Sequence, residues 1–213
     1  MRAYRLSIIR HGRTDANADG RYIGITDIPL SEEGKQELRE KYEDNDYPHV
    51  QKVYSSPLIR CTQTAEIMFP DRHLSAIFNL REMDFGDFEG KYVKDLVKNP
   101  IFADWLKGKK GVVPPNGESM QQMIERTYAA LQEILADMMN EGLTHCAVVT
   151  HAGIMMNMLS CFGLPKMKPM DFACEVGEGY EIVITPQMWM NSQAFEIMGK
   201  VPYTAEFDDG YDF

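Results

Sequence analysis

The stretch "LSIIRHGRTDAN", residues 6–17, changes character halfway along its length. It begins as a short apolar run, which is typical of a buried strand, and ends as a polar loop. Arg10, His11 and Gly12 stand at the change. A cation beside a buried segment needs a partner, because removing charge from water is unfavourable. We therefore expect this strand to present its arginine and histidine to a ligand.

Similar apolar runs recur along the chain and alternate with helical patterns. They cover residues 5–9, 50–54, 74–79, 146–150 and 180–185, with a hairpin partner expected at 194–198. This alternation is typical of α/β proteins, in which helices cover both faces of a largely parallel sheet. The sequence thus predicts a three-layer α/β/α sandwich with a mostly parallel, doubly wound sheet.

Two helices have recognisable start signals. Ser56 followed by Pro57 matches an N-cap with proline at the first helical position. Ser119 and Gln122 match a capping box, and Gly142 lies just past the last residue of the same amphipathic segment. We expect helices to begin at both places, the second with its apolar stripe facing the core.

The region between the two glycines at 90 and 117 is less regular. It contains one helix-like piece, residues 92–106, followed by "KGKKGVVPPNG". Irregular segments of this kind often lie over the active site of doubly wound proteins. We expect one domain, residues 1–213, with a small cap at about 90–117.

Charge and composition exclude several classes of protein. The 213 residues carry 32 acidic and 22 basic side chains, a net charge of −10, which disfavours a nucleic-acid-binding protein. No stretch approaches the ~18 apolar residues of a membrane span, and the first residues lack a signal-peptide pattern. The four cysteines have no C-x-x-C spacing. We expect reduced thiols, a cytoplasmic location and no membrane partner.

Five polar residues lie at or just beyond the predicted strands. Arg10 and His11 follow the first strand, Arg60 lies early in the helix after the second, Glu82 follows the third, and His151 follows the fourth. The carboxyl ends of parallel strands meet at one edge of a sheet, where ligands bind. Each residue alone is more often structural, but together they predict one site.

The residue types in this set suit phosphoryl transfer. Guanidinium groups match phosphate oxygens, and helix N-termini add N–H donors. Gly12 lets the backbone approach an oxyanion. Nearby positive charge keeps an imidazole neutral and nucleophilic, while a carboxyl group can protonate a leaving oxygen and then activate water. The set predicts a phosphohistidine mechanism that needs no metal and no cofactor.

These residues occur in motifs that resemble the histidine phosphatase superfamily, which includes phosphoglycerate mutases and alpha-ribazole phosphatases. The motifs are "IIRHGRTDAN", "GRYIGITDIPLSEEG", "SSPLIRCTQTAE", "LREMDFGDFEG", "PPNGES" and "VVTHAG", in the family's order over roughly residues 4–185. The resemblance implies that His11 is the phosphorylated nucleophile and Glu82 the proton donor. His151 is then cationic, or a hydrogen-bond donor, in the transition state. The substrate-binding set implied is Arg10, Gly12, Asn17, Ile23, Gly24, Arg60, His151 and Ala152.

Two departures bear on which reaction is catalysed. Many members have Glu or Gln where this chain has Arg13. Two interpretations of Arg13 are open: it adds positive charge at the mouth of the pocket, or it is a surface residue paired with Asp15 or Asp84. The family's mutases carry an arginine and a tyrosine after the acid glutamate, whereas Met83 and Phe85 stand here. Neither side chain clamps a carboxylate. We therefore expect a phosphatase acting on a small-molecule phosphate ester, with alpha-ribazole phosphate as a candidate.

Several questions remain open in the sequence. A phosphoglycerate mutase-type transferase and a catalytically silent phospholigand-binding protein are the alternatives to a phosphatase. A metal site built from His11, Asp15, Glu82 and His151 is a weaker alternative, because paired guanidiniums repel a cation. An apolar pocket from Tyr22, Ile23, Phe85, Phe102 and Trp105 competes with simple packing of the same residues. A homodimer is the first expectation for assembly, and the acidic tail "AEFDDGYDF" has no assigned role.

Overall fold

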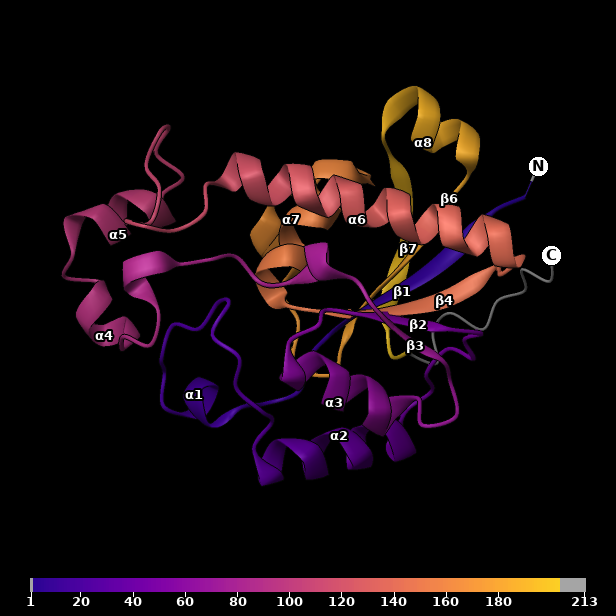
Figure 1. Ribbon diagram of the computed structural model, residues 1–213, viewed down its shortest axis with the longest axis horizontal. Coiled ribbons are helices and arrows are strands. Elements are labelled where there is room, and N and C mark those ends of the chain that lie inside the picture. The colour runs from indigo at the N-terminus through magenta and orange to yellow at the C-terminus, as the bar shows by residue number, and fades with distance from the viewer. Residues whose placement is uncertain (1, 204–213) are drawn as a thin grey trace.

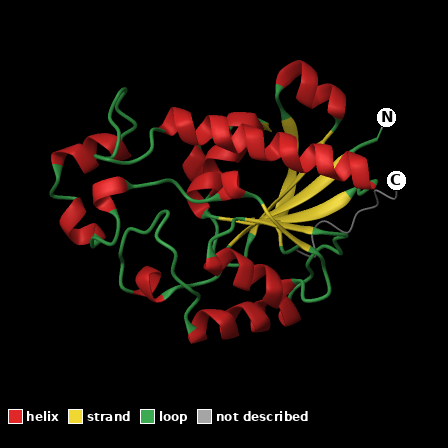
Figure 2. Ribbon diagram, in the orientation of Figure 1, coloured by secondary structure: helices red, strands yellow, loops and turns green. Residues whose placement is uncertain are grey.

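A seven-stranded sheet forms the centre of the protein in a computed structural model that describes residues 2–203 (Figures 1 and 2). The strand order is β3-β2-β4-β1-β6-β7-β5. The strands are β1 (Tyr4–Arg10), β2 (Val53–Ser55), β3 (Leu74–Ala76), β4 (His145–Thr150), β5 (Gly163–Leu164), β6 (Gly179–Ile184) and β7 (Phe195–Val201). The first four strands pair in parallel, and β6 runs antiparallel to β1 and β7. The predicted α/β class with a mostly parallel sheet is confirmed.

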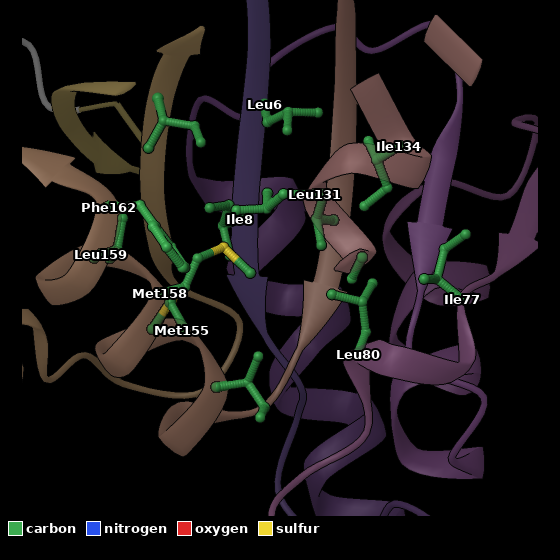
Figure 3. Packing of buried hydrophobic residues seen from close by; sticks show 14 of the residues in the cluster. Leu6, Ile8, Ile77, Leu80, Leu131, Ile134, Met155, Met158, Leu159 and Phe162 are labelled. Carbon is green, nitrogen blue, oxygen red and sulfur yellow. The ribbon is translucent and has the colours of Figure 1, made fainter. Parts of the chain in front are cut away.

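Helices cover both faces of this sheet. On one face lie α2 (Glu32–Asp44) and α3 (Ile59–Met68), which bury a cluster that includes Leu38, Met68 and Val149 (Figure 1). On the other face lie α6 (Met120–Glu141), α7 (Ala152–Phe162) and α8 (Pro186–Ser192). Figure 3 shows the second cluster, in which Leu6 and Ile8 of β1 meet side chains of α6 and α7. The two apolar layers hold the strands, and hence their carboxyl ends, in fixed positions.

The helix signals of the sequence are confirmed in one case and wrong in the other. Ser119 and Gln122 form the expected capping box of α6, and Gly142 ends the helix in the left-handed conformation at φ 72°. The other predicted start, Ser56, is wrong by two residues: Leu58 is the N-cap residue, and α3 begins at Ile59. The Ser56 hydroxyl instead accepts from Leu58 N at 3.3 Å and contacts His151.

Residues 90–117 carry two short helices rather than the single helix expected at 92–106. They are α4 (Val93–Leu96) and α5 (Pro100–Leu106). Asn99 caps α5 through its side chain and Pro100 occupies the first helical position, where a helix continuing from α4 would lose a hydrogen bond. Both helices lie at the end of the molecule remote from the labelled termini (Figure 1).

The remaining elements are short. They are α1 (Asp15–Ala18) and the 3-10 turns η1 (Phe78–Leu80), η2 (Gly86–Phe88) and η3 (Pro169–Phe172). The strand expected at 74–79 ends at Ala76 because η1 follows it, and the strand expected at 50–54 begins only at Val53. Between residues 2 and 203 no helix combines the length and apolar character needed to cross a membrane. The tail at 205–213 lies outside the described residues.

Candidate active site

His11 lies immediately after β1, with its side chain almost entirely buried at 7% exposure. Its Nδ1 lies 2.7 Å from the carbonyl oxygen of Gly12, which can only accept a hydrogen bond. Nδ1 therefore carries the proton, and Nε2 carries the free lone pair. Burial first, and then the charges of Arg60 and Arg10, lower the pKa of His11 to about 3. The imidazole is neutral at physiological pH and suited to nucleophilic attack.

Gly12 is closely surrounded. A Cβ at this position would lie 2.5 Å from Cδ1 of Leu38, so a larger residue would require the buried Leu38 side chain to shift. Its N–H donates to Thr64 Oγ1 at 2.9 Å, and the Thr64 hydroxyl donates to the carbonyl of Arg60 at 2.7 Å. Thr64 thus ties the loop after β1 to the first turn of α3. Thr64 stands in the "SSPLIRCTQTAE" motif but is not among the site residues predicted from the sequence.

His151 lies between β4 and α7 and is fully buried. Its ring centroid is 5.1 Å from that of His11, at an interplanar angle of 64°. Nε2 is 2.8 Å from Ser56 Oγ and 3.4 Å from Cys61 Sγ. Burial lowers the pKa of His151 well below its usual value, and the charge of Arg60 and any proton on His11 lower it further. The structure therefore favours a neutral His151 in the resting site.

Two buried or half-buried guanidiniums complete the positive side of the site. Arg60, only 2% exposed, donates from Nη1 to Thr26 O at 2.9 Å and from Nη2 to Gly24 O at 2.6 Å. Arg10 donates from Nη1 to Cys174 O at 2.6 Å, while its buried Nε finds no partner among residues 2–203. Within the same residues neither guanidinium has a carboxylate oxygen within 4.0 Å. An oxyanion would supply the acceptor that the Arg10 Nε lacks.

Glu82 is also buried, at 6% exposure. Oε1 accepts from Met83 N at 2.9 Å, and Oε2 accepts from Gly153 N at 3.1 Å in the first turn of α7. Burial raises the pKa of Glu82, against the opposing effect of these two N–H donors and of Arg60. A carboxyl group with a raised pKa can keep its proton and act as a general acid.

Arg126 of α6 fixes the backbone on which Glu82 stands. Its guanidinium donates to the carbonyls of Asn79 and Arg81 at 2.7 Å each and to the carbonyl of Glu82 at 3.1 Å. It is also paired with Glu118 at 2.6 Å. Arg126 is not among the site residues predicted from the sequence, because no local pattern indicates contacts with a turn more than forty residues earlier.

Most other residues expected to bind substrate lie near these groups, but with different local roles. Gly24 is buried and binds Arg60 through its carbonyl, while Ile23 and Ala152 are half-buried. Asn17 is exposed, and its Oδ1 accepts from the N–H and hydroxyl of Thr14 to close the cap of α1. Within residues 2–203, no hydrogen bond joins the Asn17 side chain to the two histidines.

Arg13 is exposed and pairs with Glu37 of α2 at 3.0 Å. The expected partners Asp15 and Asp84 were therefore wrong, because the side chain turns toward α2 instead. In the part of the chain that the structure describes, no three His, Cys, Asp or Glu side chains gather closely enough to hold a metal ion. The alternative ligand set is thus not assembled there.

An aromatic cluster joins the loop at Tyr22 to the segment at 90–117. The Tyr22 ring centroid lies 4.4 Å from Phe85, 5.3 Å from Phe102 and 5.9 Å from Trp105. Phe85 and Phe102 are buried, so packing accounts for these two rings. Tyr22 and Trp105 keep partial exposure and remain available to contact a ligand.

The model of the histidine phosphatase superfamily (branch 1) matches residues 6–193. The chain belongs to this superfamily. Its relatives include an adenosylcobalamin/alpha-ribazole phosphatase of Escherichia coli, 30% identical over 81% of this chain and 86% of the relative. They also include phosphoserine phosphatase 1 of Hydrogenobacter thermophilus, 28% identical over 80% of this chain and 82% of the relative. These matches show a phosphatase of the family, with phosphoryl transfer as its chemistry.

Solved structures give the same family fold. A structure titled as a putative alpha-ribazole-5'-P phosphatase from Escherichia coli is 26% identical, with a TM-score of 0.72 over 92% of this chain and 95% of that one. A phosphoglycerate mutase from Bacillus anthracis reaches a TM-score of 0.77 over 93% of this chain and 92% of that one, at 19% identity. The second likeness shows the fold alone.

Proposed function

We propose that this enzyme hydrolyses small-molecule phosphate monoesters through a phosphohistidine on His11, without a metal or another cofactor. The observation that carries the proposal is the neutral, buried His11 under the charges of Arg10 and Arg60, which have no carboxylate partner among the described residues. Two unpaired guanidiniums beside a nucleophile favour a small polyanion, and phosphate monoesters fit that charge.

In the first step, Nε2 of His11 attacks phosphorus and the bond from phosphorus to the ester oxygen breaks. Glu82 gives its proton to the leaving oxygen, so the alcohol departs neutral. Arg10, Arg60 and His151 donate to the three remaining oxygens. His151 begins neutral, and its proximity to a dianionic phosphoryl group raises its pKa, so a positive charge on it is stabilised as the group transfers.

In the second step, the carboxylate of Glu82 takes a proton from water, which attacks phosphorus on the face opposite His11. The bond between Nε2 and phosphorus breaks, and inorganic phosphate leaves with His11 again neutral. Both steps need Glu82 to exchange a proton near the ester oxygen. Its raised pKa supports that dual use.

Hydrolysis is favoured over mutase transfer by the residues after Glu82. Met83 is 2% exposed and packs in the core, and Phe85 is buried against Tyr22, so neither clamps a substrate carboxylate. Without a carboxylate clamp at these two positions, the dephosphorylated product leaves and water takes its place. A transferase or a silent binding protein remains the alternative that the assay below separates.

For the substrate, we propose an ester with an apolar or aromatic leaving group, covered by residues 90–117 acting as a cap on a single domain. Tyr22 and Trp105 support this choice by their partial exposure. Alpha-ribazole phosphate is one candidate because of the relatives' names. We further propose a cytoplasmic location, because all four cysteines are free thiols. For assembly we propose a homodimer, with no nucleic-acid or membrane partner.

The test compares p-nitrophenyl phosphate with 3-phosphoglycerate in mildly acidic buffer, with and without EDTA. We expect metal-independent hydrolysis, faster for the aromatic ester, and an acid-labile phosphoryl group on the enzyme after rapid quenching. Transfer to a second phosphoglycerate in preference to water would indicate a mutase. Phosphate binding without turnover would indicate a silent binding protein.

A further inference from the structure

The loop at residues 24–26 receives its hydrogen bonds from side chains on two opposite sides. Among the described residues, its N–H and C=O groups make no backbone–backbone hydrogen bond. Its carbonyls instead accept from Arg60, at 2.6 Å for Gly24 and 2.9 Å for Thr26. Backbone polar groups need partners, so something must also serve the N–H groups.

Glu89 takes that role. Its carboxylate accepts from the N–H groups of Gly24 at 3.1 Å, Ile25 at 3.0 Å and Thr26 at 3.4 Å. It also accepts from the Thr26 hydroxyl at 2.6 Å and from Phe85 N at 3.2 Å. These five hydrogen bonds to one carboxylate are charge-assisted, and they fix the orientation of the peptide groups in the loop.

The space beside Gly24 admits no side chain. A Cβ at Gly24 would lie 2.0 Å from the Met83 carbonyl and 2.4 Å from Glu89 Oε1. Glu89 thus stands on the N–H side of the loop and the Arg60 guanidinium on its C=O side. The peptide groups of the loop are polarised in one direction because an acid lies on one side and a cation on the other. The hydrogen bonds on the two sides therefore strengthen each other.

We propose that Glu89 is a positioning residue that sets the orientation of the Arg60 guanidinium, and hence phosphate affinity, through the loop at 24–26. Among the described residues, the Glu89 side chain makes no hydrogen bond to His11 or Glu82, and four of its five hydrogen bonds come from the loop at 24–26. The inference rests on the proposed function, because Arg60 is assigned there as a phosphate ligand.

The experiment measures phosphate affinity and turnover separately. Glu89→Gln keeps the size of the side chain but leaves only one oxygen to accept hydrogen bonds. We expect competitive inhibition by inorganic phosphate to weaken on the order of 10-fold, and kcat/KM for p-nitrophenyl phosphate to fall by a similar factor. Thr26→Val removes only the hydroxyl donor, and we expect a roughly 2–3-fold effect in the same direction. Asp87→Asn is the matched control, because Asp87 lies in the same turn and is exposed, and within residues 2–203 its side chain has Asn116 as its one hydrogen-bond partner, at 3.1 Å.

A double-mutant cycle with Arg60→Lys decides whether the effect passes through Arg60. If it does, adding Glu89→Gln to Arg60→Lys should weaken phosphate inhibition by less than twofold more, because residues acting in series are not additive. Fully multiplicative effects, or a Glu89→Gln enzyme that behaves like Asp87→Asn, would overturn the assignment while leaving the phosphatase proposal intact. If Glu89→Gln fails to fold, Thr26→Val decides, and an unaltered phosphate affinity in that variant would overturn the assignment of Glu89. A wild-type protein that neither binds phosphate nor hydrolyses the ester would overturn the proposed function itself.

Discussion

The two ends of β4 each carry a histidine, and the surroundings of the two differ in charge. His145 begins the strand and lies 3.0 Å from Ser7 Oγ and 3.3 Å from the Glu181 carboxylate. Glu181 also accepts from Arg5 Nε at 3.0 Å and from the Tyr203 hydroxyl at 2.6 Å. At this end the cation and the carboxylate neutralise each other.

His151, just past the other end of β4, has no acid as its hydrogen-bond partner in the described structure, only Ser56 and Cys61. Arg60 is among the charged groups that act on His151, and the pKa of Glu82, which accepts from the N–H of Gly153 two residues further on, is raised. A neutralised cluster needs no ligand, whereas an excess of buried positive charge is stabilised by an anion. The comparison predicts that variants at the first end change stability and variants at the second end change catalysis.

The largest effect is expected at His11. His11→Ala removes the only group assigned to bond phosphorus, so hydrolysis of p-nitrophenyl phosphate should fall to background, with no phosphoryl-enzyme after rapid quenching. Thermal unfolding should stay near that of the wild type. Rates close to wild type in this variant would show that another residue is the nucleophile.

Glu82→Gln should lower turnover ~100-fold or more, as loss of a general acid typically does. The penalty should be larger for an alkyl phosphate than for p-nitrophenyl phosphate, because p-nitrophenolate leaves without a proton. Since the wild-type acid must be protonated, and its pKa is raised, activity should fall as pH rises through that pKa. Stopped-flow measurement of the first turnover should show the descending limb in the wild type and its loss in the variant. Equal penalties for the two esters would contradict the acid role.

Glu181→Gln should change stability while leaving kcat near the wild-type value. Bonds from His145, Tyr203 and Arg5 outweigh burial and lower the pKa of Glu181 to about 2 from 4.5. A depressed carboxyl pKa stabilises the fold above pH 4.5, and this contribution is lost as pH falls toward 2. The shift corresponds to ~3 kcal/mol above pH 4.5, which urea unfolding of the two proteins should detect. A loss of kcat at unchanged stability would place Glu181 in the catalytic machinery instead.

The sequence could predict the sheet, and the approach of His11 to His151, because both follow from the order of strands along the chain. Apolar runs mark buried strands, and the carboxyl ends of parallel strands meet at one edge, so His11 and His151 are brought together by topology. The errors arose where tertiary contacts prevail over local signals. Ser56 matches an N-cap, yet its hydroxyl serves His151, and α3 begins two residues later than expected.

Residues that act through the backbone were missed for the same reason. Arg126 binds carbonyls more than forty residues away, and Glu89 binds N–H groups more than sixty residues away. Neither lies at a strand end, and a single arginine or glutamate on a helix or turn is usually a surface residue. Only the folded chain shows that these side chains hold the backbone beside Glu82 and Arg60.

Arg13→Ala should have the smallest effect on activity. It tests whether the positively charged region of the site extends to the exposed Arg13 side chain. The Arg13 side chain is exposed and pairs with Glu37 at 3.0 Å, an exposed ion pair of the kind that contributes about 0–1 kcal/mol. Glu37 already neutralises the Arg13 charge, and at moderate salt Debye screening over about 10 Å weakens any remaining interaction with the site. We therefore expect kcat/KM for p-nitrophenyl phosphate within about twofold of wild type.

Glu37→Gln is the informative companion variant, because it leaves the Arg13 charge without its carboxylate partner. A marked fall in KM for a carboxylated phosphate ester in Glu37→Gln, reversed by adding Arg13→Ala, would mean that Arg13 reaches the pocket mouth and that the positive region extends beyond the buried residues.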